Sequence, residues 1–567
     1  MLEPPERVRT PRLPVTHGVN SDMRNGLLIG AVTGIGAILA VACGSSATVG
    51  DTTLPEVEGG TSGKPGSSGL PGSSGNPGGD SGTSGDIDSG TDGGGDGGSV
   101  LPTTLKPGAA ILIGITSDGY VAYLSIGATA ASLEVVPVTG GAPTVLIPTF
   151  AQTDGVTVSG ASVAYWTNVT AGIGTLGYWS KASGPKAAVA ALSKSGMFFS
   201  TTDSARIAFS VGATATSTDL ALTTPVAAAN APVLTGAVGA GRAINLAAAA
   251  SVGGAPPNCA PAIRFKGNIL FAAYCTGVLA ATTAARLVTI PDASTTAKRL
   301  DNASNVAAGS ITPFVSADTT GTKVFVIDSG ANATGRIIFN GAALTQAGLE
   351  NDTKTGLMLD DGTGVFYRVQ NTAGTTKAIK HATTAASPVI TPLVATNAEG
   401  FFAISNDQTH ALYHTLPPAS GLVDIRSLAT KPPATSVDIV ATAVAFPFGF
   451  TGNGASVLYQ TDVDAKGVGN LKSKPTAGGA EKQLAAAMYD ARPLRTGTGV
   501  LVLDNPVDDA TNMITNVDIK YLDSAGAAAP ALLAGTVPSD GFDVSGTHLV
   551  YARFTGADAG LYSIALP

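Results

Sequence analysis

Ten short segments of similar pattern recur along the chain at intervals of about 48 residues. Each segment begins with small or polar residues and continues into aliphatic residues that lead to an aromatic or aliphatic position, as in SDGYVAYL at Ser117–Leu124. The recurring position falls at Tyr123, Tyr165, Phe209, Phe271, Val326, Tyr367, Tyr413, Tyr459, Val502 and Tyr551. A period of this length is typical of solenoids and propellers, whose units bury their apolar faces only against their neighbours.

Each repeat has the alternation of period two that indicates β-strands. The first repeat contains four such runs, AILIGIT, YVAYLSI, SLEVVPV and PTVLIP, separated by turns rich in Gly, Asp and Ser. Four strands in about 40–50 residues is the size of one propeller blade. We therefore predict an all-β fold over residues 101–567: a β-propeller of about ten four-stranded blades, in the range 8–10, with a single ring favoured over two rings.

The sequence predicts that the two ends of the repeat region pair with each other. The last repeat ends after what reads as a third strand, and the segment VLPTTLKP, Val100–Pro107, precedes the first strand of the first repeat. We expect this segment to supply the missing outer strand, because pairing would cover an open sheet edge. The best candidate for a helix is EKQLAAAMYDARPL, from Glu481, as one connection between repeats.

The turn and strand pattern of the first repeat resembles the repeats of TolB-like bacterial β-propellers. The residues that carry this likeness are Ser117, Asp118, Gly119, Val121, Tyr123, Leu133, Gly140, Gly141 and Leu146. The other repeats keep the hydrophobic pattern and lose much of the turn signature. The resemblance therefore implies the propeller architecture more firmly than membership of the family.

An uncharged apolar run, Leu27–Ala42, occupies the N-terminal region directly after Arg24. Its 16 residues fall short of the roughly 20 that a membrane-spanning helix needs and lie nearer the length of a signal-peptide core. We predict that residues 1–42 are a signal peptide whose true start is Met23.

The end of this run, Leu39–Gly44, resembles the lipobox of bacterial lipoproteins, in which small residues precede a cysteine that becomes lipidated. The resemblance implies lipidation of Cys43, cleavage before it and attachment through the lipid to a membrane of the bacterial cell envelope, on the periplasmic or cell-surface side. The alternative is an uncleaved anchor in which Cys43 is incidental.

Residues 43–100 read as a disordered linker, because they include 19 Gly and almost no residues that form a core. A chain of this type has an end-to-end distance of about 40 Å. The linker carries a net charge of −7 and the body only −2, so the body lacks the basic surface that nucleic-acid binding requires. We predict no nucleic-acid partner.

The chain has three cysteines, and two of them, Cys259 and Cys275, flank a predicted hairpin that turns at Lys266–Asn268. With that turn the two side chains would lie opposite each other, and a disulfide would suit an oxidising compartment. Two reduced, buried thiols are the alternative.

No catalytic residue, cofactor or metal site is predicted. His410 and His414 are four residues apart on a predicted strand, where they lie about 13 Å apart and cannot share a metal ion. Trp166 and Trp179, with Tyr165 and Tyr178 beside them, read as packing residues in preference to a sugar-stacking platform.

The resulting functional hypothesis is a cell-envelope lipoprotein whose propeller binds or scaffolds an envelope protein or glycan. The alternative is an extracytoplasmic hydrolase or lyase with its site at the mouth of the propeller channel. An adhesin-like stalk is a third reading, based on the Gly triplets of Gly63–Asp80. Fold alone does not choose between them, and the ligand and oligomeric state stay open.

Overall fold

The regular secondary structure of the described residues consists of β-strands, which turns and loops connect. This computed structural model describes residues 101–567 apart from 152–153, 172, 194–197, 202–206, 215–216, 224–261, 277–283, 291–297, 301–315, 329–333, 372–373, 375–376, 416–421, 465, 509–513, 527–530 and 555. The predictions for residues 1–100, including the signal peptide, Cys43 and the linker, lie outside these residues. Within the described part, no helix has the length and apolar character needed to cross a membrane.

The first strands in chain order are β1 (Thr103–Pro107), β2 (Ala110–Ile115), β3 (Tyr120–Ile126), β4 (Ala131–Pro137), β5 (Thr144–Phe150), β6 (Gly155–Ser159), β7 (Ser162–Thr170), β8 (Ile173–Ser180), β9 (Gly184–Ser193), β10 (Phe198–Ser200), β11 (Ile207–Thr214), β12 (Ser217–Thr223), β13 (Ala262–Lys266), β14 (Ile269–Thr276), β15 (Ala284–Ile290), β16 (Lys298–Arg299), β17 (Ser316–Ala317), β18 (Lys323–Asp328), β19 (Thr334–Asn340) and β20 (Leu344–Gly348). The remaining strands are β21 (Thr353–Met358), β22 (Gly364–Gln370), β23 (Lys377–Thr383), β24 (Ile390–Val394), β25 (Gly400–Ile404), β26 (His410–His414), β27 (Val423–Ala429), β28 (Ser436–Phe450), β29 (Ser456–Thr461), β30 (Gly469–Pro475), β31 (Lys482–Met488), β32 (Asp490–Pro493), β33 (Gly499–Asp508), β34 (Ile514–Asp523), β35 (Ala531–Pro538), β36 (Phe542–Ser545), β37 (His548–Arg553) and β38 (Gly560–Ala565).

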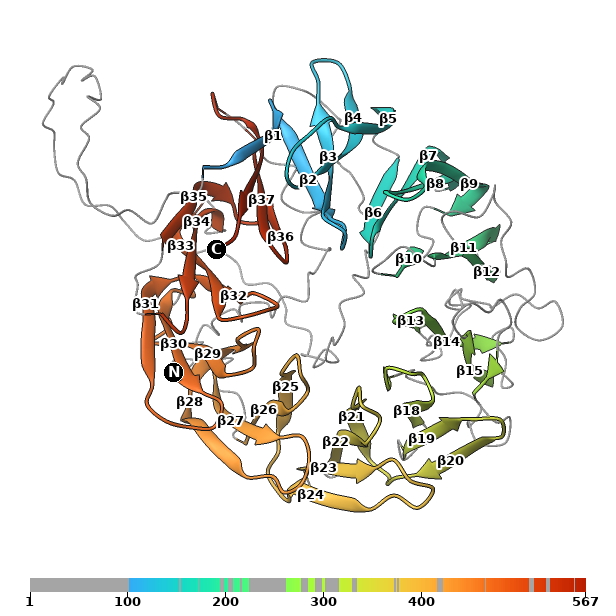
Figure 1. Cartoon of the computed structure of the whole chain (residues 1–567), viewed down its shortest axis with the longest axis vertical. Coiled ribbons are helices and arrows are strands. Elements are labelled where there is room, and N and C mark those ends of the chain that lie inside the picture. The colour runs from blue at the N-terminus through green and yellow to red at the C-terminus, as the bar shows by residue number, and fades with distance from the viewer. Residues whose placement is uncertain are drawn as a thin grey trace, which may run out of the picture. The chain divides into compact units, whose positions relative to one another are not determined.

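The sheets are antiparallel meanders, in which strands that follow one another in the sequence are hydrogen-bonded neighbours (Figure 1). Four-stranded sheets include β2–β5, β6–β9, β13–β16, β17–β20, β21–β24 and β32–β35. All ten recurring positions of the sequence pattern lie on strands with a paired neighbour on each side, which are β3, β7, β11, β14, β18, β22, β26, β29, β33 and β37. The all-β fold of mostly four-stranded antiparallel sheets is therefore confirmed, and the number of blades and the single ring stay predictions.

One long strand joins two of these meanders. β28 has 15 residues and pairs with β27 between Ser436 and Ala445 and with β29 between Phe446 and Phe450. A single seven-stranded sheet, β25–β31, results from this shared strand. The outer strand of one repeat thus continues without a turn as the first strand of the next.

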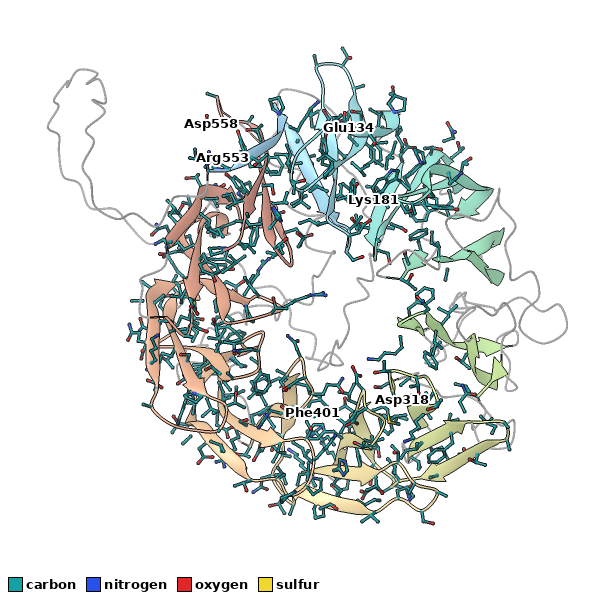
Figure 2. The ribbon with its side chains drawn as sticks, in the orientation of Figure 1. Glu134, Lys181, Asp318, Phe401, Arg553 and Asp558 are labelled. Atoms are coloured by element: carbon teal, nitrogen blue, oxygen red, sulfur yellow. The ribbon has the colours of Figure 1, made fainter. Side chains whose placement is uncertain are left out.

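The hydrophobic core lies between consecutive sheets, not inside any one of them. On β3, Val121 and Tyr123 pack with β37 and β38, whereas Ala122 and Leu124 pack toward the sheet of β6–β9. The same division recurs on β22, where Tyr367 contacts the preceding sheet and Phe366 the following one. Phe366 meets Phe401 of β25 edge to face, with ring centroids 5.4 Å apart, and Figure 2 shows side chains filling these spaces.

The prediction that the beginning of the body joins its end is confirmed. β1 pairs antiparallel with β38, so the last sheet has the order β1-β38-β37-β36. The register places Thr103 opposite Ser563 and Pro107 opposite Gly560. The strand that completes the last sheet therefore comes from the opposite end of the body.

The helix predicted from Glu481 is wrong, because this segment forms β31 and β32. Leu484 and Met488 of β31 are buried between the sheets, and the strand pairs with β30 through a bulged register. Ala487 has a φ of +52°, which an α-helix does not allow. Pairing and burial thus override the helix propensity of the alanines.

We predict that Leu105→Asp destabilises the protein by about 3 kcal/mol, because it places an unpaired carboxylate in the core between the last sheet and the first. The matched control is Leu101→Asp, since Leu101 is 81% exposed whereas Leu105 is 7% exposed. Urea unfolding of both variants measures the difference. Equal stability of the two variants would contradict the closing role of β1.

Candidate functional site

Five of the turns between the first and second strands share one backbone design. In each, the N–H of the fourth residue donates to the carbonyl of the first, at 3.0 Å from Gly119 to Thr116 and at 2.8 Å from Gly362 to Leu359. Gly119 and Gly362 have φ values of +83° and +65°, which glycine adopts without steric cost. We name the turns at 116–119, 318–321, 359–362, 405–408 and 451–454 the turn network.

An oxygen of the third residue fixes several of these turns. Asp118 accepts a hydrogen bond of 2.6 Å from the hydroxyl of Thr116, and Asp407 accepts one of 2.6 Å from Ser405. Asn453 plays the same part with Thr451 at 2.8 Å. The carboxylates of the S-D-G pattern therefore act first as caps of the turns.

Hydrogen bonds also connect the turns of neighbouring sheets. The N–H of Ser117 donates to Gly160 O at 2.9 Å, and the N–H of Asn453 donates to Gly497 O at 2.9 Å. The side-chain amide of Asn406 donates to Arg495 O at 2.7 Å, across two sheets. The four turns from 318–321 to 451–454 are thus joined to one another and are not independent loops.

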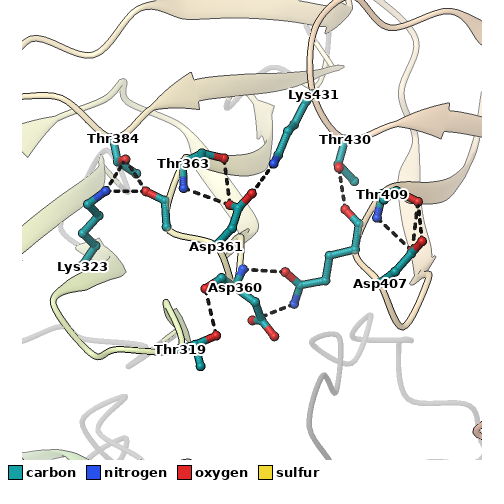
Figure 3. Close-up of polar contacts among 12 residues, drawn as sticks. Thr319, Lys323, Asp360, Asp361, Thr363, Thr384, Asp407, Thr409, Thr430 and Lys431 are labelled. Carbon is teal, nitrogen blue, oxygen red and sulfur yellow. Dashed lines mark hydrogen bonds and ion pairs between the residues drawn. The ribbon is translucent and has the colours of Figure 1, made fainter.

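Asp360 is the centre of the turn network. Its carboxylate lies 2.7 Å from Lys266 Nζ and accepts a hydrogen bond of 2.9 Å from Gln408 Nε2, while its own N–H donates to Gln408 Oε1 at 2.7 Å. The carbonyl of Asp360 accepts from the N–H and the hydroxyl of Thr319, each at 2.9 Å. This one residue links four consecutive sheets, and Figure 3 shows its contact with Thr319.

The neighbouring Asp361 binds Lys431, which lies between β27 and β28 of the following sheet (Figure 3). Burial acts to raise the pKa of Asp361, but hydrogen bonds from Lys431 and Thr363 outweigh it and lower the pKa to about 2. Asp361 is therefore charged throughout the physiological range. Lys323 of the preceding sheet donates to Gly362 O at 2.6 Å and adds a cation on the other side.

His410, which follows the turn at 405–408, is not arranged as a catalytic base. Thr409 Oγ1 lies 2.9 Å from His410 Nδ1 and donates to the carboxylate of Asp407 at 2.9 Å. In a nucleophile–histidine–acid triad the acid binds the histidine, whereas here it binds the hydroxyl. His410 and His414 are the two ends of β26, as the sequence predicts. Among the described residues no group of three or more His, Cys, Asp or Glu is placed to hold a metal ion.

The recurring tyrosines have structural roles. Tyr367 and Lys380 face each other across β22 and β23, and both bind Glu350, at 2.7 Å each. Tyr123 donates to the buried Glu134 at 2.6 Å. Burial and then the neighbouring carboxylate raise the pKa of both phenols, so they stay neutral at physiological pH.

The aromatic residues of the second repeat are buried, as predicted. Trp166 and Trp179 are each 4% exposed, and the ring of Trp179 meets Tyr120 edge to face at 5.0 Å. Tyr165 and Tyr178 are buried beside them. Packing between sheets, not stacking on a sugar, accounts for this group.

The cysteine hairpin forms with a register one residue away from the expected one. Its loop is Gly267–Asn268, with Lys266 opposite Ile269 and Ala262 opposite Ala273. Cys259 itself lies outside the described residues, so the disulfide stays a prediction, as does lipidation of Cys43.

Comparison of the sequence with protein-family models and with curated proteins gives no match. Among solved structures, prolyl oligopeptidase B from Galerina marginata matches with 13% identity and a TM-score of 0.31, over 64% of this chain and 52% of that one. A eukaryotic initiation factor matches with 11% identity and a TM-score of 0.38, over 67% and 88% of the two chains. TolB from Acinetobacter baumannii matches with 11% identity and a TM-score of 0.24, over 53% and 80%.

The chain thus spans about half the length of the peptidase that it matches. With identities of 11–13% and TM-scores below 0.4, these likenesses transfer no activity, substrate or partner to this chain.

We predict that Asp360→Ala lowers the free energy of unfolding by about 1 kcal/mol, because it removes the bonds to Lys266 and Gln408 at a half-exposed position. Asp540→Ala is the control, since Asp540 is an exposed residue between β35 and β36. Denaturant unfolding of both variants measures the difference. Indistinguishable midpoints would show that Asp360 does not join the sheets energetically.

Proposed function

We propose that this chain is a bacterial cell-envelope lipoprotein that displays its β-propeller as a binding or scaffolding module for an envelope protein or glycan. The turn network is the observation that supports it. Its carboxylates, lysines and amides are hydrogen-bonded to one another across neighbouring sheets, so the surface is ordered before any partner arrives. Preorganised surfaces lose less conformational entropy on binding.

The contacts in the network favour binding over catalysis. Asp407 binds the hydroxyl of Thr409 and not His410, and Asp360 and Asp361 are held by Lys266 and Lys431. These are side chains in fixed ion pairs and caps, without a base aimed at a nucleophile. No observation among the described residues favours the hydrolase or lyase alternative, which stays a prediction.

We further propose that the sheets close into a single ring of about ten blades. The pairing of β1 with β38 supports closure, and buried clusters between consecutive sheets support a continuous stack. A linker of residues 43–100 would hold such a ring away from the membrane to which Cys43 attaches it.

The anchor is tested with Cys43→Ser. In a bacterial host grown with labelled palmitate, we expect label and membrane association for the natural chain and neither for the variant, because only a thiol accepts the diacylglycerol. Cys275→Ser is the control and should retain both. If the natural chain takes up no label, the proposed lipid anchor is wrong, and that result leaves the description of the fold unchanged.

The binding face is tested by photo-crosslinking in intact cells. We expect a crosslinking amino acid at the exposed Arg495, whose carbonyl joins the network, to trap a partner protein. The same substitution at Leu532, which is 60% exposed on the outer strand β35, should trap none. Adducts at Leu532 alone would place the binding face elsewhere, and adducts at neither position would count against a protein partner at the network.

A further inference from the structure

His381 lies buried directly beneath the turn that carries Asp360 and Asp361. It is the fifth residue of β23, it is 5% exposed, and its Nε2 is buried without a hydrogen-bond partner. The ring packs on Gly364, where a Cβ atom would come within 2.0 Å of Nε2. Only glycine at residue 364 allows the turn to close over the imidazole.

The charges that face His381 come from two different sheets. Asp361 belongs to the turn above it, and Lys431 reaches Asp361 from the segment between β27 and β28. The residues opposite His381 on the neighbouring strands, Phe366 on β22 and Thr391 on β24, are uncharged. Lys323 approaches the same turn from the preceding sheet through Gly362 O and Thr384.

This environment favours the neutral imidazole. Burial lowers the pKa of His381, the positive charge of Lys431 lowers it further, and Asp361 opposes both without reversing the direction. A proton on Nε2 would also point at Gly364, which offers no acceptor there. The closed turn therefore holds His381 unprotonated, whereas a histidine exposed by opening of the turn would titrate near pH 6.5.

We propose that His381 makes this turn a pH-sensitive switch: mildly acidic conditions open residues 359–364, because proton uptake by the exposed imidazole stabilises the open form. Opening separates Asp361 from Lys431 and moves Asp360 away from Lys266 and Gln408. Protonation of His381 thus breaks the contacts of Asp360, the residue that links four sheets. This inference rests on the geometry of the turn and not on the proposed partner.

The direction follows from proton linkage. The open form binds more protons than the closed form below about pH 6.5, so the stability of the closed turn is complete above that pH and is lost as the pH falls. The opening equilibrium constant rises by at most about tenfold for each pH unit, and the rise stops at the lowered pKa of the closed state. Asp361 does not titrate in this range.

The test is hydrogen exchange on the full chain between pH 7.5 and 4.5, corrected for the intrinsic pH dependence of exchange. The reporters are the amides of Leu359 and Gly362, which donate within the turn at 2.9 and 2.8 Å. The internal control is the turn at Thr451–Ser456, closed by equivalent bonds of 2.9 and 2.8 Å and free of titratable side chains. We expect protection at Leu359 and Gly362 to fall by up to about fivefold between pH 6.5 and 5.5, with no change in the control.

Two variants test whether His381 causes the pH dependence of the turn. His381→Phe, which fills the same space without titrating, should abolish the extra pH dependence. If His381→Phe does not fold, Lys431→Met provides the second test, because removal of this cation lets the closed state accept the proton and should reduce the dependence. An unchanged ratio of the two turns in the natural chain, or a persistent pH effect in His381→Phe, overturns the proposal.

Discussion

Burial of the second strands on both faces is the constraint on which the rest of the structure depends. Alternate residues of β3 enter two different cores: Val121 and Tyr123 pack toward the last sheet, and Ala122 and Leu124 pack toward the next. A sheet with two apolar faces has no stable existence alone in water, because each face must be covered by a neighbour. The first and last sheets meet the same requirement by packing against each other, and β1 contributes Leu105 to that core while it pairs with β38.

The sequence is informative where one residue type repeats for one physical reason. The aromatic or aliphatic position recurs because it lies in the middle of a second strand, and most of the turns end in glycine because their fourth residue has a positive φ. Such local rules allowed the strands and the pairing of β1 to be predicted. The helix at Glu481 was wrong because alanine content reports local propensity, whereas pairing with β30 decides the outcome.

The pairing register of the strands does not follow from these local patterns. Single-residue bulges interrupt the first strands at Ile113, Phe402 and Phe448, each beside the partner of a recurring tyrosine. A bulge re-aims one side chain, and Phe402 and Phe448 pack into the cores instead of lying on the surface. One residue more or less in a turn moves every pair, as in the cysteine hairpin, whose two-residue loop Gly267–Asn268 replaces the expected three-residue turn.

The contacts of the turn network likewise do not follow from local sequence patterns. Lys266 is 94 residues from Asp360 in the chain and Gln408 is 48 residues from it, so no local motif joins them. Gln408 has a φ of +57° at the position where other turns have glycine, and its side chain binds Asp360. A residue that accepts an unfavourable backbone conformation at this position gives the network a contact that glycine lacks. The repeat supplies the scaffold, and departures from the repeat supply the specific surface that a partner would recognise.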